Sequence, residues 1–199
     1  MNLTEFLARV GVSAHPPKRG VAIMLVLLSL AMFLPGFVSL QPMDRDEPRF
    51  AQATKQMLET GDYVAIRFQM EARNKKPVGV YWLQAGFVAG AEALGVPQAR
   101  AQIWLYRLPS LIGAVATVLL TWWAAIALVG EGAALIAAML MASTILLGVE
   151  ARLAKTDALV AATVAAAMGV LARHWMARGR KAAALSNANQ WLLAGVFWA

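Results

Sequence analysis

The residues best suited to chemistry stand just after the first strongly apolar stretch of the chain. Asp46, Glu47 and Arg49 follow the apolar segment over residues 20–40. Carboxylates can act as general bases and an arginine can bind anions, so this position suits an enzyme that works at a membrane face. The same residues also suit a helix start, because acidic residues and Pro48 are favourable in a first helical turn. The motif alone leaves both interpretations open.

The composition indicates that these residues belong to a membrane protein. Of 199 residues, 60% are hydrophobic and 15% are charged, and the mean hydropathy is +0.59. A soluble domain is roughly half apolar and about a quarter charged. The net charge of +7 is not arranged in an aromatic and basic face, so nucleic acid is not a predicted partner. The chain has no cysteine, which excludes disulfides and thiolate metal sites.

Hydropathy divides the chain into spans that must position these residues. Four segments are long enough to cross about 30 Å of hydrocarbon as helices. We therefore predict an all-α polytopic protein of the inner (plasma) membrane, in contact with membrane lipids. The predicted spans, in order, are residues 20–40, 104–129, 133–153 and 157–175.

Basic residues in two short segments set the predicted orientation. Residues 1–19 and residues 176–188 are both rich in basic side chains, and the positive-inside rule places both in the cytoplasm. Four spans between them satisfy this arrangement. Residues 41–103 then form one long segment on the periplasmic or extracellular side, and Asp46 and Asp157 share that side.

Two interfacial helices are predicted within residues 41–103. Apolar side chains recur at helical spacing over about residues 48–60, with polar side chains on the opposite face. Residues 77–95 are long enough to span, but they carry Gln84, Glu92 and four glycines. Counting them as a span would also move the basic segment 176–188 outside, so we place them on the outer face.

The final segment, residues 189–199, is apolar and stops without a cap or a polar flank. A spanning helix needs about 20 residues. We predict that this segment is the start of a fifth span that is cut short, and that the chain is part of a longer enzyme.

Five motifs, taken in order, resemble a known family. They are Asp46-Glu47-x-Arg49-Phe50-Ala51, Gly61-Asp62-Tyr63, Lys76-Pro77-x-x-x-Tyr81-Trp82-Leu83, Arg107-Leu108-Pro109-Ser110 and Arg152-Leu153-Ala154-Lys155-Thr156-Asp157. Together they resemble the membrane glycosyltransferases of the GT-C class. The resemblance is closest to the branch that holds the lipid A aminoarabinose transferases and the protein O-mannosyltransferases. It extends over about residues 30–175, the amino-terminal portion of such enzymes.

The resemblance implies a fold, a reaction and its partners. It implies two interfacial helices in the first external loop and a sugar donor linked to a polyprenyl phosphate. The acceptor would be lipid A, another envelope glycan or a protein hydroxyl, at the outer face of the inner membrane. No cofactor is predicted. The family often has a second proline where this chain has Val78, and some members carry an acidic residue where this chain has Lys75. If that acid binds a metal in those members, the lysine here disfavours a metal site, so dependence on a divalent metal stays open.

Five residues receive roles in this hypothesis. Transfer from a lipid phosphate needs a base for the acceptor and cations for the departing phosphate. Asp46 is the predicted base, with Glu47 as its neighbour and Asp157 ordering the acceptor or the base. Lys76 and Arg49 are predicted to bind the donor phosphate. The simpler alternatives are helix caps for the acids and contacts with lipid headgroups for the basic residues.

Two other functions remain as alternatives. A lipid-sugar transporter or flippase subunit would carry polar residues or broken helices inside its spans, whereas polar residues here gather at span ends. A non-catalytic membrane anchor would tolerate loss of every outer-face carboxylate. Arg107 and Arg152 are interpreted as side chains that snorkel to the interface.

Overall fold

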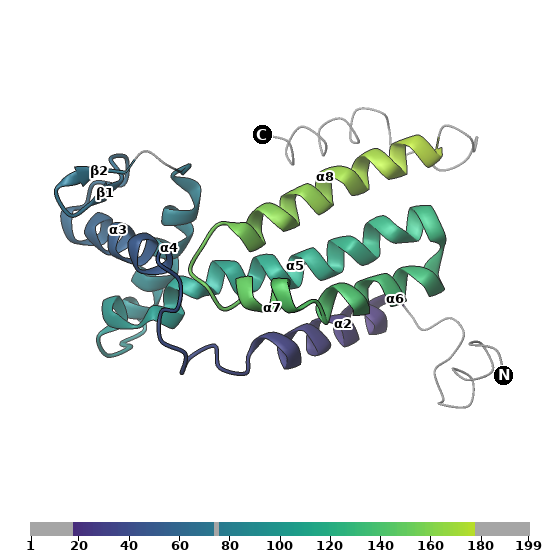
Figure 1. The fold of residues 1–199 in the computed structure, drawn as a ribbon, viewed down its shortest axis with the longest axis horizontal. Coiled ribbons are helices and arrows are strands. Elements are labelled where there is room, and N and C mark those ends of the chain that lie inside the picture. The colour runs from purple at the N-terminus through teal and green to yellow at the C-terminus, as the bar shows by residue number, and fades with distance from the viewer. Residues whose placement is uncertain (1–17, 74–75, 178–199) are drawn as a thin grey trace.

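The structure is a bundle of long apolar helices with a smaller module at one end (Figure 1). The computed structural model describes residues 18–73 and 76–177. Within them, α2, α5, α6 and α8 lie side by side, and α3, α4 and a two-stranded hairpin form the end module. The elements are α2 (Lys18–Phe33), α3 (Glu47–Thr60), β1 (Arg67–Phe68), β2 (Glu71–Ala72), α4 (Gly79–Ala93), a 3₁₀ turn (Ala99–Ala101), α5 (Ile103–Val129), α6 (Glu131–Ala142), α7 (Ile145–Glu150) and α8 (Asp157–Ala177).

The helices α5 and α8 are long and apolar enough to cross a membrane. They occupy the segments expected at residues 104–129 and 157–175. The helices α2 and α6 are apolar but shorter. Most of the predicted cytoplasmic segments and the predicted fifth span, residues 189–199, lie outside the described residues. The sidedness of the segments stays a prediction.

The first apolar helix is shorter than the expected span over residues 20–40. Helix α2 ends at Phe33, two residues before Pro35, and Gly36 then adopts a positive φ of 81°. A residue before proline is disfavoured in helical conformation, and glycine accepts a left-handed conformation at little cost. The chain therefore turns at residues 34–39 instead of continuing as a helix.

The expected span over residues 133–153 is two helices, α6 and α7, rather than one. The hydroxyl groups of Ser143 and Thr144 both donate hydrogen bonds of 3.0 Å to the carbonyl oxygen of Leu140. Such side-chain bonds compete with the backbone bonds that would continue the helix. The hairpin of β1 and β2 was not expected either, because strands of two residues leave no readable alternation.

The module packs as a small core of its own. The apolar face of α3 buries Phe50, Ala53 and Met57, and the ring of Phe50 stacks on Tyr81 of α4 with centroids 5.3 Å apart. Pro48 stands in the first turn of α3, and Gly61 ends the helix with a φ of 72°. The predicted amphipathic helix thus places its apolar face against α4.

A buried glutamine joins the module to the bundle. Gln84 of α4 is fully buried, and its Oε1 atom accepts a 2.6 Å hydrogen bond from the hydroxyl of Thr54 in α3. Its Nε2 atom donates to the carbonyl oxygen of Tyr106 in α5 over 3.2 Å. A buried polar group must find partners, and here those partners fix three helices relative to one another.

The two candidate spans α5 and α8 approach closely through small residues. A Cβ atom added at Gly113 of α5 would lie 2.9 Å from backbone atoms of Ala158 and Leu159 in α8. Farther along, Gly169 of α8 faces the ring of Trp123 in α5. Close backbone approach at small residues is a common basis of helix association in membranes.

The contact at Gly113 can be tested by adding one methyl group. We expect Gly113→Ala to destabilise the purified protein by about 1–3 kcal/mol, because the new Cβ overlaps backbone that cannot rotate away. The measurement is the unfolding temperature in detergent. Gly86→Ala is the matched control, because a Cβ there meets nothing within 4 Å. Equal unfolding temperatures for the two variants would contradict the close approach.

Candidate functional site

A buried ion pair links the first helix of the module to the bundle. Arg107 of α5 donates from Nε to Oε1 of Glu47 over 2.7 Å and from Nη2 to Oε2 over 3.3 Å. The side chains are only 1% and 0% exposed. We call this pair the Glu47–Arg107 clamp. Buried charges of this kind are tolerated only when they are paired and hydrogen-bonded.

The clamp also holds two backbone segments. Nη1 of Arg107 donates 2.8 Å hydrogen bonds to the carbonyl oxygens of Phe37 and Leu40. Oε1 of Glu47 accepts a 3.1 Å bond from the backbone N–H of Ala154. The clamp therefore joins the turn after α2, the start of α3, α5 and the loop before α8.

The two interface arginines have roles that sequence reasoning missed. Arg107 is buried, so its interpretation as a snorkelling side chain is wrong. Arg152 donates to the carbonyl oxygens of Met32, Pro35 and Gly148. It therefore binds the C-terminal end of α2, where a cation is favoured by the helix dipole. Their position in the sequence could have indicated these roles, because an ionisable residue within or beside a membrane span usually pairs with another group.

A second charged group lies around Lys155, in the loop between α7 and α8. Its Nζ atom lies 2.7 Å from Oδ2 of Asp44, 3.5 Å from Oδ2 of Asp157 and 3.6 Å from Oε1 of Glu150. We call these four residues the Lys155 cluster. It draws its members from the segment before α3, the end of α7 and the start of α8. Of the four, only Asp157 was predicted as a site residue.

The cluster shifts the pKa values of Asp44 and Lys155, its two members that lie in loops. The hydrogen bond from Lys155 holds the pKa of Asp44 below its ordinary value of 3.8. Burial acts to lower the pKa of Lys155, but the hydrogen bond to Asp44 and the three nearby carboxylates outweigh it and raise the pKa. Both shifts favour the charged forms, so the Lys155–Asp44 ion pair persists over a wide pH range.

In the sequence, the predicted base Asp46 lies between Asp44 of the Lys155 cluster and Glu47 of the Glu47–Arg107 clamp. It occupies the N-cap position of α3, but its side chain makes no capping hydrogen bond. Instead, Oδ1 accepts a 3.2 Å bond from Nη1 of Arg49, and the Asp46 side chain is 44% exposed. Asp46 is thus accessible to a ligand, whereas Glu47 is fully enclosed by the clamp. This burial favours a positioning role for Glu47 over direct contact with a substrate.

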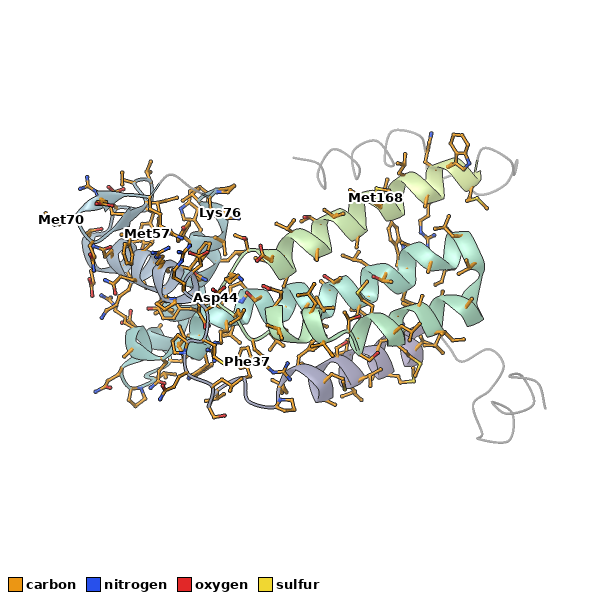
Figure 2. All side chains as sticks on the ribbon, viewed as in Figure 1. Phe37, Asp44, Met57, Met70, Lys76 and Met168 are labelled. Carbon is orange, nitrogen blue, oxygen red and sulfur yellow. The ribbon has the colours of Figure 1, made fainter. Side chains whose placement is uncertain are left out.

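The predicted site residues are only partly brought together. Asp46 contacts Arg49, and Asp157 contacts Lys155 and through it Asp44. Lys76 is exposed, and in the described part of the chain it makes no hydrogen bond or ion pair with the others. Figure 2 shows Lys76 and Asp44 at the same end of the molecule, on the side of the module. Among the described residues, no group of three or more His, Cys, Asp or Glu side chains has an arrangement that could hold a metal ion.

Comparison with solved structures identifies the architecture. The chain superposes on the crystal structure of ArnT from Cupriavidus metallidurans in the apo state with a TM-score of 0.72, at 18% sequence identity. This match covers 90% of the chain and 31% of ArnT. The chain has a GT-C membrane fold. The structure of the same ArnT bound to undecaprenyl phosphate matches equally well, with 91% of this chain covered.

These matches confirm the predicted fold class, an all-α membrane protein with GT-C-like helices. ArnT is a lipid A aminoarabinose transferase, and the chain spans about a third of its length. No protein-family model matches the chain, and no curated protein matches it in sequence. At this level of identity the likeness concerns the fold.

The clamp can be tested by removing one of its charges. We expect Arg107→Met to destabilise the protein by about 3–5 kcal/mol, because Glu47 would remain buried without a partner. Equilibrium unfolding in detergent measures this loss. Adding Glu47→Leu to this variant should recover part of the stability, because no unpaired charge would remain. Lys55→Gln is the control, because its exposed pair with Glu59 contributes less than about 1 kcal/mol. A double variant less stable than Arg107→Met would contradict this account.

The Lys155–Asp44 pair predicts a specific pH dependence. The pKa of Asp44 is lowered in the folded protein, so its ionised form stabilises the fold above the ordinary value of 3.8. That contribution is lost as the pH falls through the folded-state pKa. We expect Asp44→Asn to lower the unfolding temperature near neutral pH, and the difference from wild type to shrink below pH 3.8. Glu71→Gln on the exposed hairpin should show no such change, and a constant difference at all pH values would contradict the assignment.

Proposed function

We propose that this chain carries part of the active site of a membrane glycosyltransferase. The enzyme would transfer a sugar from a polyprenyl-phosphate-linked donor to lipid A, another envelope glycan or a protein hydroxyl. The observation that carries the proposal is the likeness to ArnT, which has been crystallised with undecaprenyl phosphate. The ordered motifs that resemble this class contribute acidic and basic side chains that are at least partly exposed, namely Asp46, Arg49, Lys76 and Asp157.

The proposed reaction is a single displacement with inversion. Asp46 accepts the proton of the acceptor hydroxyl, and the acceptor oxygen forms a bond to the anomeric carbon. The bond from that carbon to the phosphate oxygen breaks, and the polyprenyl phosphate leaves with the electron pair. Lys76 and Arg49 stabilise the charge that gathers on the phosphate, as preorganised cations do in other transfer reactions.

The surroundings of Asp46 support its role as the base. Its carboxylate is accessible, and its neighbours along the chain are anchored, Asp44 by Lys155 and Glu47 by Arg107. Arg49 contacts Asp46 directly, so a phosphate bound by Arg49 would lie near the base. Asp157 is 48% exposed at the start of α8, where it can order the acceptor through its own carboxylate or through Lys155.

The proposal also assigns a location. The apolar helices α5 and α8 support residence in the inner membrane. The basic segments at residues 1–19 and 176–188 favour the cytoplasmic side for the opposite end of the bundle. The module and the acidic residues would then face the periplasm, where a polyprenyl-linked sugar and an envelope acceptor can meet.

Transfer activity tests the role of Asp46. We expect Asp46→Asn in the full-length gene product to lower the transfer rate by about 10²–10⁴-fold, because the amide cannot accept the proton. The measurement is complementation of the deleted gene together with transfer to the acceptor in purified membranes.

Glu59→Gln is the matched control, because Glu59 is an exposed acid near the other end of the same helix. Wild-type transfer by Asp46→Asn at normal expression would overturn the assignment. Movement of a lipid-linked sugar across proteoliposomes without transfer would instead favour a transporter. Full complementation of the deleted gene after loss of every outer-face carboxylate would favour a non-catalytic membrane anchor.

A further inference from the structure

One buried charged side chain in the module has no oppositely charged partner among the described residues. Arg73 follows strand β2 and is only 8% exposed. No described carboxylate lies within ion-pair distance of its guanidinium group. By contrast, the other buried arginine, Arg107, is paired with Glu47. A buried cation without a counter-charge is costly, so the position of Arg73 needs a separate explanation.

The protein holds Arg73 in an aromatic cradle. Its guanidinium carbon lies 5.3 Å from the centre of the Phe50 ring, and Nε donates a 3.3 Å hydrogen bond to the hydroxyl of Tyr81. The backbone N–H of Arg73 donates to the carbonyl oxygen of Ile66 over 2.8 Å. The aromatic rings are themselves buried and stacked. These contacts fix the orientation of the guanidinium group, but they supply no negative charge.

The end of the guanidinium group remains available for a ligand. Only Nε has an acceptor among the described residues, so the two terminal nitrogens retain their donor capacity. Such a fork suits two oxygens of one anion, and arginine binds phosphate in this bidentate manner. Stacking on an aromatic ring leaves the edge of the guanidinium plane free for such bonds.

Two neighbouring features favour an anion at the same place. Lys76 follows Arg73 by three residues, so their Cα atoms are separated by at most about 11 Å. Helix α4 begins at Gly79 without a capping side chain and without an acidic residue in its first turn. The positive end of the helix therefore adds to the two cations.

From these observations we infer that Arg73 binds the phosphate group of the polyprenyl-phosphate donor together with Lys76. The inference rests on the proposed function and extends its donor site by a residue that the motifs did not indicate. The phosphate would supply the negative charge that Arg73 lacks in the free protein. Phe50 and Tyr81 would act as positioning residues, because they orient the guanidinium group without contacting the phosphate.

Binding measurements on the full-length protein in lipid nanodiscs test this inference. The probes are undecaprenyl monophosphate, undecaprenol as its neutral counterpart, and inorganic phosphate. We expect Arg73→Gln to weaken binding of undecaprenyl monophosphate by about ten- to hundredfold. The affinity of Arg73→Lys should fall between those of the wild type and Arg73→Gln, because lysine keeps the charge but cannot form two parallel hydrogen bonds. Binding of undecaprenol should be unaffected.

The matched control is Arg67→Gln, which removes an exposed arginine from the other strand of the same hairpin. Its affinity for undecaprenyl monophosphate should equal that of the wild type. If inorganic phosphate binds as well and Arg73→Gln weakens the binding of both ligands, the site also accepts a free phosphate. If only the lipid shows the loss, the site requires a lipid headgroup. Both results support phosphate binding by Arg73.

A purely structural role for Arg73 gives a different result. Arg73→Gln or Arg73→Lys would then lower the unfolding temperature but leave the affinity of the folded protein unchanged, and this outcome would overturn the inference. If Arg73→Gln fails to fold, Arg73→Lys provides the decisive affinity. A wild-type protein that binds neither phosphate probe would overturn the proposed function as well. Wild-type binding with unchanged variants would overturn only the role of Arg73.

Discussion

The buried contact between Glu47 and Arg107 is the constraint on which the arrangement of the module depends. The Arg107 guanidinium donates four hydrogen bonds, two to the Glu47 carboxylate and two to backbone carbonyl oxygens. Removing two charges from water costs several kcal/mol per ion unless such bonds replace the lost hydration. Because Phe37 and Leu40 are held by the same guanidinium as Glu47, the segment that joins α2 to α3 cannot move independently of α5.

Hydropathy predicted the helices well, because long apolar segments can satisfy their backbone groups in a membrane only as helices. It overestimated continuity where local chemistry intervened, at Pro35 and Gly36 after α2 and at Ser143 and Thr144 after α6. The contact between Asp46 and Arg49 was within reach of sequence reasoning because the residues are one helical turn apart. Lys155 and Asp44 are separated by 111 positions, and no local pattern indicates such a pair.

The polar connections differ in kind between the module and the bundle. Inside the bundle, α5 and α8 approach through glycine, and the hydroxyl of Thr117 in α5 donates to the carbonyl oxygen of Ala158 in α8. At the module end, the charged side chains of Arg107 and Lys155 join segments that are far apart in the sequence. Charged residues in the sequence therefore indicated where to look for a candidate site. They did not indicate which carboxylate pairs with which basic side chain. Small residues set the distance between helices, and charged residues set the path of the loops.

The anchoring on both sides of Asp46 has a consequence for the energetics of ligand binding. Two residues before it, Asp44 is bound to the loop preceding α8, and immediately after it, Glu47 is bound to α5. The main chain at Asp46 therefore has little conformational freedom in the free protein, so little is left to lose when a ligand arrives. Binding energy that a mobile loop would use for ordering itself remains available for the contacts made by the ligand.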